Sequence, residues 1–136
     1  MPRSGSKPVR LLLDSNRFIA YCSGDSEVID RLDAAIQIWV PFVVLAEIRV
    51  GARLLKRGDE QAQLLIKFLQ QPGVFTAHST DATTHHYAIL YAQLRQQGTP
   101  IPVHDIWIAA LALEHSLVLY THDAHFSHLP QIPTVR

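Results

Sequence analysis

The fold of this chain is decided at Val9-Arg10-Leu11-Leu12-Leu13-Asp14-Ser15-Asn16, where an apolar run ends abruptly in a polar loop. A short apolar run bounded in this way is typical of a buried strand of a parallel sheet. Asp14 then stands at the carboxyl end of the strand. Asn16 is expected to cap a helix that continues through Ala20 or beyond.

The same alternation of apolar strands and amphipathic helices continues along the chain. Further strands are expected at residues 36–40, 74–76 and 117–120, with residues 132–135 as a candidate for the closing strand. Helical spacing of apolar residues separates them, and a parallel sheet covered on both faces is the arrangement that such alternation favours. We therefore expect a three-layer α/β/α fold with a central, mainly parallel sheet. Residues 1–8 are expected to be a flexible segment and residues 9–136 one domain.

Composition limits the function only loosely. The 136 residues contain twelve Lys and Arg against twelve Asp and Glu, so any contact with nucleic acid must depend on local basic patches. Cys22 is the only cysteine, which excludes an internal disulfide and a four-cysteine zinc site. The sequence shows neither an apolar run of membrane-spanning length nor a signal-peptide core, and a cytoplasmic location is expected.

Four carboxylates stand in unusually apolar surroundings. Asp14 and Asp123 follow predicted strands, Glu47 lies inside a predicted apolar helix, and Asp105 falls in the first turn of another. Burying a carboxylate without a partner costs several kcal/mol, so a buried cluster is stable mainly when a cation neutralises it. Hard divalent cations such as Mg²⁺ and Mn²⁺ prefer oxygen ligands, which makes a metal site the leading hypothesis.

Each of these residues also has a structural interpretation. Asp14 and Asp123 could cap the helices that follow, and Asp105 could interact with a helix dipole. Glu47 could instead form an ion pair with an arginine. The candidate partners are Arg10, Arg49 and Arg53.

The histidines suggest a second metal chemistry. His122, His125 and His128 are spaced three apart and His104 precedes Asp105, a collection that could bind zinc or nickel. No complete helical metal motif is present among them, so the carboxylate site is the preferred interpretation.

Four segments together carry a family resemblance. They are Leu11-Leu12-Leu13-Asp14-Ser15-Asn16, Leu45-Ala46-Glu47-Ile48-Arg49-Val50-Gly51-Ala52, Asp105-Ile106-Trp107-Ile108-Ala109-Ala110, and Leu119-Tyr120-Thr121-His122-Asp123 with Phe126. In this order the segments resemble the acidic motifs of PIN-domain proteins, and the chain's size and neutral charge are similar to those of the VapC toxins. Two positions depart from the family pattern, since His104 stands where many relatives have Asn and His125 where many have a second acidic residue.

The resemblance implies a metal-dependent endoribonuclease that is the toxin of a toxin–antitoxin pair. Asp14 and Asp105 would bind Mg²⁺ or Mn²⁺ directly, Asp123 directly or through water, and Glu47 would bind the ion or orient the attacking water. The ion would lower the pKa of a bound water, which attacks phosphorus in line. The resemblance also implies a VapB-like antitoxin and a homodimer. A PIN-like module that binds a partner without cutting is the alternative.

Polar and basic neighbours complete the predicted site. Ser15, Asn16 and Thr121 are candidates to fix the carboxylates by hydrogen bonds, although turn and cap roles would suit them equally. Candidate RNA contacts are Arg17, Arg49 and Arg53, with a solvent-exposed helix face as the alternative interpretation.

Overall fold

Five parallel strands form one sheet, in the order β3-β2-β1-β4-β5, in the computed structural model, which describes residues 8–136. The strands are β1 (Arg10–Leu13), β2 (Gln37–Pro41), β3 (Val74–Ala77), β4 (Val118–Tyr120) and β5 (Thr134–Val135). The predicted parallel sheet is confirmed, and every neighbouring pair in it is parallel. The predicted flexible segment 1–8 lies, apart from Pro8, outside the described residues.

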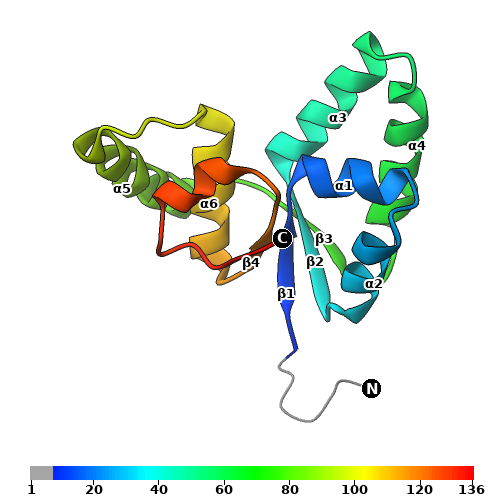
Figure 1. Ribbon diagram of the computed structural model, residues 1–136, viewed down its shortest axis with the longest axis horizontal. Helices are drawn as coiled ribbons and strands as arrows, with labels where there is room; N and C mark the ends of the chain where they lie inside the picture. The colour runs from blue at the N-terminus through cyan, green and yellow to red at the C-terminus, as the bar shows by residue number, and fades with distance from the viewer. Residues whose placement is uncertain (1–7) are drawn as a thin grey trace.

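Helices cover both faces of the sheet, which gives the predicted three layers (Figure 1). One group follows β1 and β2 and consists of α1 (Ser15–Cys22), α2 (Ser26–Ala34), α3 (Phe42–Leu54) and α4 (Gly58–Leu69). The other group follows β3 and consists of α5 (Asp81–Gln97) and α6 (Val103–His115). The chain returns from β3 to β4 through this second group, so right-handed crossovers place the groups on opposite faces. A short 3₁₀ helix, η1 (Ala124–His128), joins β4 to β5.

The core is built around the central strand and α6. Leu11, Leu12 and Leu13 of β1 are almost completely buried, as a strand covered on both faces requires. Leu13 pairs with Tyr120 of β4, so these neighbouring strands end at the same level. The residues that follow them, Asp14 and Thr121, are thereby brought side by side at the carboxyl edge.

One helix cap differs from the prediction. Asp14, and not Asn16, caps α1, because its extended backbone lets its side chain accept a hydrogen bond from the N–H of Ser15 at 2.8 Å. The main-chain N–H groups of Arg17 and Phe18 donate to the carbonyl of Asp14, which starts the helix earlier than expected.

The boundaries of the strands agree with prediction to within two residues, the largest difference being β5, which begins at Thr134 instead of residue 132. β1 begins at Arg10 and β2 at Gln37, each one residue later than expected. Thr80 precedes α5 and donates its N–H to the Thr83 hydroxyl at 2.8 Å. Within residues 8–136, no helix has both the length and the apolar character needed to cross a membrane.

Candidate functional site

The site begins where β1 and β4 end. Asp14 and Thr121 are both buried, at 4 % and 3 % exposure. The Asp14 N–H donates to the carbonyl of Tyr120 at 3.1 Å, continuing the pairing of the strands. The Thr121 hydroxyl donates to Asp14 Oδ2 at 2.6 Å, so the two strand ends are joined through side chains as well. This bond fixes the orientation of the Asp14 carboxylate.

Asp105 and Asp123 meet on either side of His125. Nδ1 of His125 lies 2.8 Å from Asp105 Oδ2 and 3.0 Å from Asp123 Oδ1. The three residues have potential ligand atoms within 4.8 Å of one another. Asp105 projects from the first turn of α6, whereas Asp123 and His125 come from the loop after β4 and from η1. Residues from three separate elements thus converge on one small volume.

A network of hydrogen bonds holds these groups in place. The Thr121 hydroxyl accepts from the N–H of Asp123 at 2.9 Å while it donates to Asp14. The Asn16 amide donates to Asp14 Oδ2 at 3.4 Å, and its Oδ1 accepts from the N–H of His122 at 3.2 Å. Ser15 contributes its main-chain N–H. All three predicted supporting residues therefore contact Asp14, although their functional roles remain predictions.

Two of the carboxylates also make the cap contacts that their sequence positions allowed. Asp14 caps α1, and Asp123 caps η1 by accepting from the N–H of His125 at 2.9 Å. A carboxylate has about four lone-pair sites, so capping leaves room for further bonds. Capping and metal binding are therefore compatible at both positions.

The electrostatics of the site favour an added positive charge. The pKa of Asp105 is raised to about 6, mainly by burial and also by repulsion from Asp123 and Asp14, against the lowering effect of His125. Burial likewise raises the pKa of Asp14, partly offset by its hydrogen bonds to Thr121 and Ser15. The bond to Asp105 raises the pKa of His125, which favours a positive charge between the carboxylates.

Glu47 lies at the margin of this cluster. Its Oε1 is 3.6 Å from Nδ1 of His104, so the α3 carboxylate faces the start of α6. Within residues 8–136, no arginine lies within ion-pair distance of Glu47, and Arg10 instead donates to the Gln37 side chain and the His115 carbonyl. The predicted alternative of an arginine partner is wrong. Apart from the departure from the family pattern at position 104, no sequence feature indicated the contact of His104 with Glu47.

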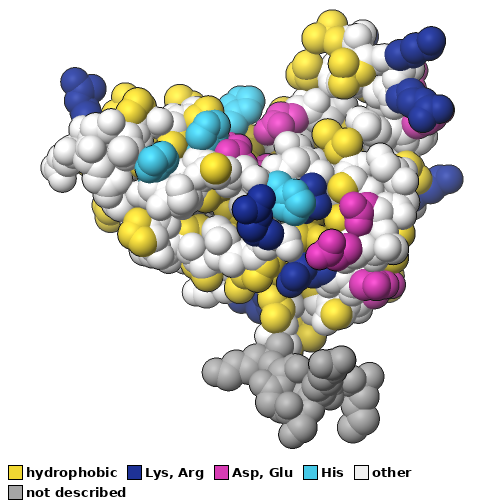
Figure 2. Space-filling view, viewed as in Figure 1, with side chains coloured by type: hydrophobic (Ala, Val, Ile, Leu, Met, Phe, Trp, Pro, Cys, Tyr) yellow, Lys and Arg dark blue, Asp and Glu magenta, His cyan; other side chains and the backbone are white. Residues whose placement is uncertain are grey.

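The three-histidine hypothesis is not supported by the geometry. Of His122, His125 and His128, only His125 contributes to the one cluster of potential metal ligands in the described part of the chain. The donors that converge are carboxylate oxygens and one imidazole, a mainly hard set that suits Mg²⁺ or Mn²⁺ better than a histidine-rich site would. Figure 2 shows acidic and histidine side chains gathered in the hollow between the α5–α6 side and the α3 side.

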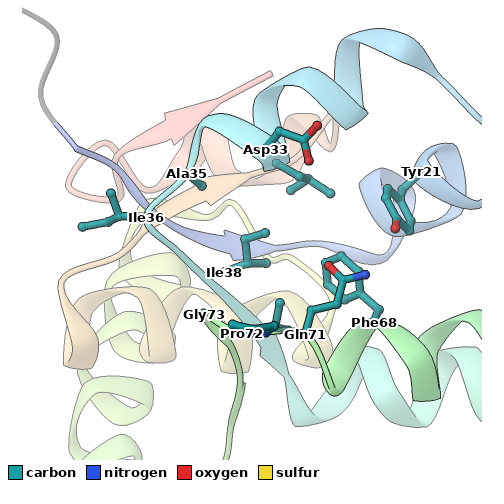
Figure 3. Close-up of a pocket in the computed structure, with 11 residues that line it drawn as sticks. Tyr21, Asp33, Ala35, Ile36, Ile38, Phe68, Gln71, Pro72 and Gly73 are labelled. Atoms are coloured by element: carbon teal, nitrogen blue, oxygen red, sulfur yellow. The ribbon is translucent and has the colours of Figure 1, made fainter. Parts of the chain in front are cut away.

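A separate cavity lies at the opposite edge of the sheet. It has a volume of about 200 Å³ and is bordered by the residues that precede β2 and β3, together with the ends of α2 and α4 (Figure 3). Asp33 is the only carboxylate among the residues that line it. This cavity therefore lacks the groups that the chemistry of the carboxyl edge requires.

Comparison with known proteins identifies the class that this fold and site define. The PIN domain model matches residues 11–132. Ribonuclease VapC5 of Mycobacterium tuberculosis is 31 % identical over 125 residues, covering 90 % of this chain and 89 % of that protein. Ribonuclease VapC4 of the same organism is 30 % identical, covering 71 % and 74 % respectively. This chain belongs to the PIN domain family and, within it, to the VapC toxin ribonucleases of VapBC toxin–antitoxin systems.

The fold is also shared with solved structures. A chain in the crystal structure of VapBC2 from Rickettsia felis, bound to a promoter DNA fragment, superposes with a TM-score of 0.82. The match covers 93 % of this chain and 98 % of that chain at 21 % identity, so it bears on the fold alone.

Proposed function

We propose that this chain is a divalent-metal-dependent endoribonuclease that hydrolyses RNA phosphodiester bonds as the toxin of a toxin–antitoxin pair. The observation that carries the proposal is the convergence of Asp14, Asp105 and Asp123 at the carboxyl edge of the sheet, where doubly wound folds bind their ligands. Membership of the VapC ribonucleases supports RNA as the substrate class.

The residues present fit a Mg²⁺ or Mn²⁺ ion. Asp14 and Asp105 would bind it directly because both are buried and both have raised pKa values, which a cation would reverse. Asp123, which is more exposed, would bind it directly or through water. When bound, such an ion supplies positive charge that makes water more acidic and offsets charge developing on the phosphate oxygens.

The chain's own side chains would perform the positioning. Thr121 holds Asp14 and, through the N–H of Asp123, the following loop. Glu47 reaches the same side from α3 and would orient the attacking water. His125 would keep Asp105 and Asp123 together before the ion arrives, since it contacts both carboxylates. Fixed geometry of this kind lowers the entropy cost of reaching the transition state.

The proposed partners are a VapB-like antitoxin and a second copy of the chain. The solved relatives include complexes described as VapBC, which supports an antitoxin for this chain too. Large apolar side chains are exposed at the end of α3, where Leu54 is 77 % and Leu55 61 % exposed. Such residues are typical of surfaces that a partner covers. The proposed location is the cytoplasm, which is consistent with a single cysteine and with an RNA substrate.

The direct test is cleavage of a pool of structured RNAs by the purified protein with Mg²⁺, Mn²⁺ or EDTA. Asp14→Asn and Asp105→Asn should abolish metal-dependent cutting, whereas Asp33→Asn, the same change at the opposite edge of the sheet, should leave it intact. Thermal unfolding of all variants would show whether a loss reflects misfolding. If no form cuts, the binding-module alternative is favoured; if all forms cut equally, the cutting does not depend on these carboxylates, and in either case the catalytic proposal is wrong.

A further inference from the structure

Two arginines lie against one buried aromatic ring beside the acidic cluster. The guanidinium carbon of Arg17 is 5.9 Å from the centre of the Tyr120 ring, and that of Arg31 is 5.3 Å from the same centre. Arg17 comes from α1 and Arg31 from α2, whereas Tyr120 is the last residue of β4. Tyr120 is 1 % exposed, so its ring is a fixed support for both cations.

Neither arginine is neutralised within the described residues. No carboxylate oxygen of residues 8–136 lies within ion-pair distance of Arg17 or Arg31. Nε of Arg17 donates to the neutral Oδ1 of Asn16 at 3.0 Å. Nε of Arg31 is buried and has no hydrogen-bond partner. A buried donor without an acceptor is costly, so the protein itself leaves the guanidinium of Arg31 incompletely partnered.

Arg10 shows what a structural arginine looks like in the same chain. Its guanidinium also lies over an aromatic ring, 5.8 Å from the centre of Trp39. Its donors, however, are used by the Gln37 side chain at 2.8 Å and the His115 carbonyl at 3.0 Å. Stacking alone therefore does not explain why the Arg31 Nε is left without a partner.

The arginine pair is connected to the acidic cluster by Asn16. Asn16 accepts from Arg17 Nε at 3.0 Å and donates to Asp14 Oδ2 at 3.4 Å. Thr121, the residue after Tyr120, bonds Asp14 on the other side. Figure 2 shows arginine or lysine side chains together with a histidine near the centre of the viewed face, close to acidic groups. A chain molecule held at Asp14 would therefore pass these cations.

We propose that Arg17 and Arg31 form a binding site for a backbone phosphate of RNA adjacent to the one being cut. The inference rests on the proposed function, because it places the scissile phosphate at Asp14. Guanidinium groups bind phosphate oxygens with paired hydrogen bonds, and stacking on Tyr120 would hold them ready to do so. RNA is favoured over an acidic peptide because its phosphates repeat at regular intervals, so fixing one brings the next to the arginines. Arg31 was absent from the RNA contacts predicted from sequence.

The test measures binding without cleavage. Anisotropy of a short labelled single-stranded RNA is followed in EDTA over a range of salt concentrations, for the wild type, Arg17→Gln and Arg31→Gln. Each substitution should weaken binding at low salt and reduce the slope of log affinity against log salt by about 0.7, the value of one single-strand phosphate contact. Arg31→Lys, which keeps the charge, should retain the slope. Arg95→Gln on α5 is the control for an unrelated exposed arginine and should change nothing.

Several outcomes would overturn the phosphate site. These are no RNA binding by the wild type, unchanged slopes in Arg17→Gln and Arg31→Gln, an equal loss in Arg95→Gln, or displacement of RNA by polyglutamate as readily as by unlabelled RNA. Thermal unfolding identifies any variant that fails to fold, and the remaining arginine variant then carries the test. If the arginine variants bind normally while the wild type cuts RNA, only this site is wrong. If arginine-dependent binding is present without cutting, only the catalytic proposal is wrong.

Discussion

Asp105 is buried and has close carboxylate neighbours. Ionisation of Asp105 therefore lowers the free energy of unfolding of the metal-free protein, to a degree that depends on pH. The pKa of Asp105 rises from 3.8 to about 6 on folding. The folded state thus binds the Asp105 proton more tightly than the unfolded state does. The contribution of this proton to the stability of the folded state is therefore complete below pH 3.8. It is lost as the pH rises through about 6.

We therefore expect Asp105→Asn to stabilise the metal-free protein at neutral pH. The difference in free energy of unfolding between variant and wild type should be small near pH 4 and grow to about 3 kcal/mol above pH 7, as the shift in pKa requires. Chemical denaturation in EDTA at several pH values measures it. Mg²⁺ should bring the wild type back towards the variant, since protons and the ion compete for the same oxygens. A difference that does not vary with pH would contradict this account of Asp105.

Thr121 offers a second test at this scale because its hydroxyl serves two partners. It donates to buried Asp14 and accepts from the N–H of Asp123. Thr121→Val keeps the shape and removes both bonds, so we expect a loss of about 1–3 kcal/mol in stability together with a lower rate of RNA cleavage. Thr121→Ser should keep most of both properties. Equal behaviour of the Val and Ser variants would show that the hydroxyl does not position the carboxylate.

At the scale of elements, the turn between α3 and α4 depends on close backbone contact. A Cβ at Gly58 would overlap the carbonyl of Gly51 and lie 2.6 Å from the Cα of Ala52. A Cβ at Gly51 would meet only the flexible end of Leu55, at 3.4 Å. Only glycine at position 58 therefore lets the start of α4 pack against the end of α3.

We expect Gly58→Ala to destabilise the protein by about 1–3 kcal/mol or more, because overpacking must displace one helix against the other. Gly51→Ala, within α3, should be neutral or stabilising by up to about 1 kcal/mol. Thermal or chemical unfolding of the two variants compares them directly. Similar stability of both variants would mean that the α3–α4 turn adjusts freely.

Sequence patterns predicted the elements well where the signal was local. The three leucines before Asp14 predicted β1, and all three are buried in that strand. The cap of α1 was predicted at Asn16 and occurs at Asp14, because both side chains have cap chemistry and only the backbone geometry decides between them. The local sequence therefore does not predict which of the two residues caps the helix.

At the scale of the whole molecule, the site depends on strand order. Alternating strands and helices predicted a parallel sheet with acidic residues at its carboxyl edge, but not that β4 would lie beside β1. Because β4 lies beside β1, the Thr121 hydroxyl is placed to donate a hydrogen bond to Asp14. The contact of His125 with Asp105 likewise joins the loop after β4 to the start of α6, so no pattern within either segment could predict it.

The overall charge of the chain did not predict the site either. Acidic and basic groups balance across the whole chain but are separated locally. Asn16 joins the two kinds of group, since its amide donates to Asp14 and its Oδ1 accepts from Arg17, which lies with Arg31 against Tyr120. A neutral protein can therefore carry the proposed metal site next to the proposed phosphate site. The arrangement follows from packing three helices and two strand ends together.

The most direct measurement is the identity of the ends produced when the protein cuts RNA with Mg²⁺ in H₂¹⁸O, determined by mass spectrometry. Attack by water held at the acidic cluster predicts that the new phosphate monoester carries one ¹⁸O, that no 2′,3′-cyclic phosphate forms, and that Asp105→Asn yields no such product. Cyclic phosphate ends, or ¹⁸O-labelled product formed equally by Asp105→Asn, would contradict hydrolysis at this site.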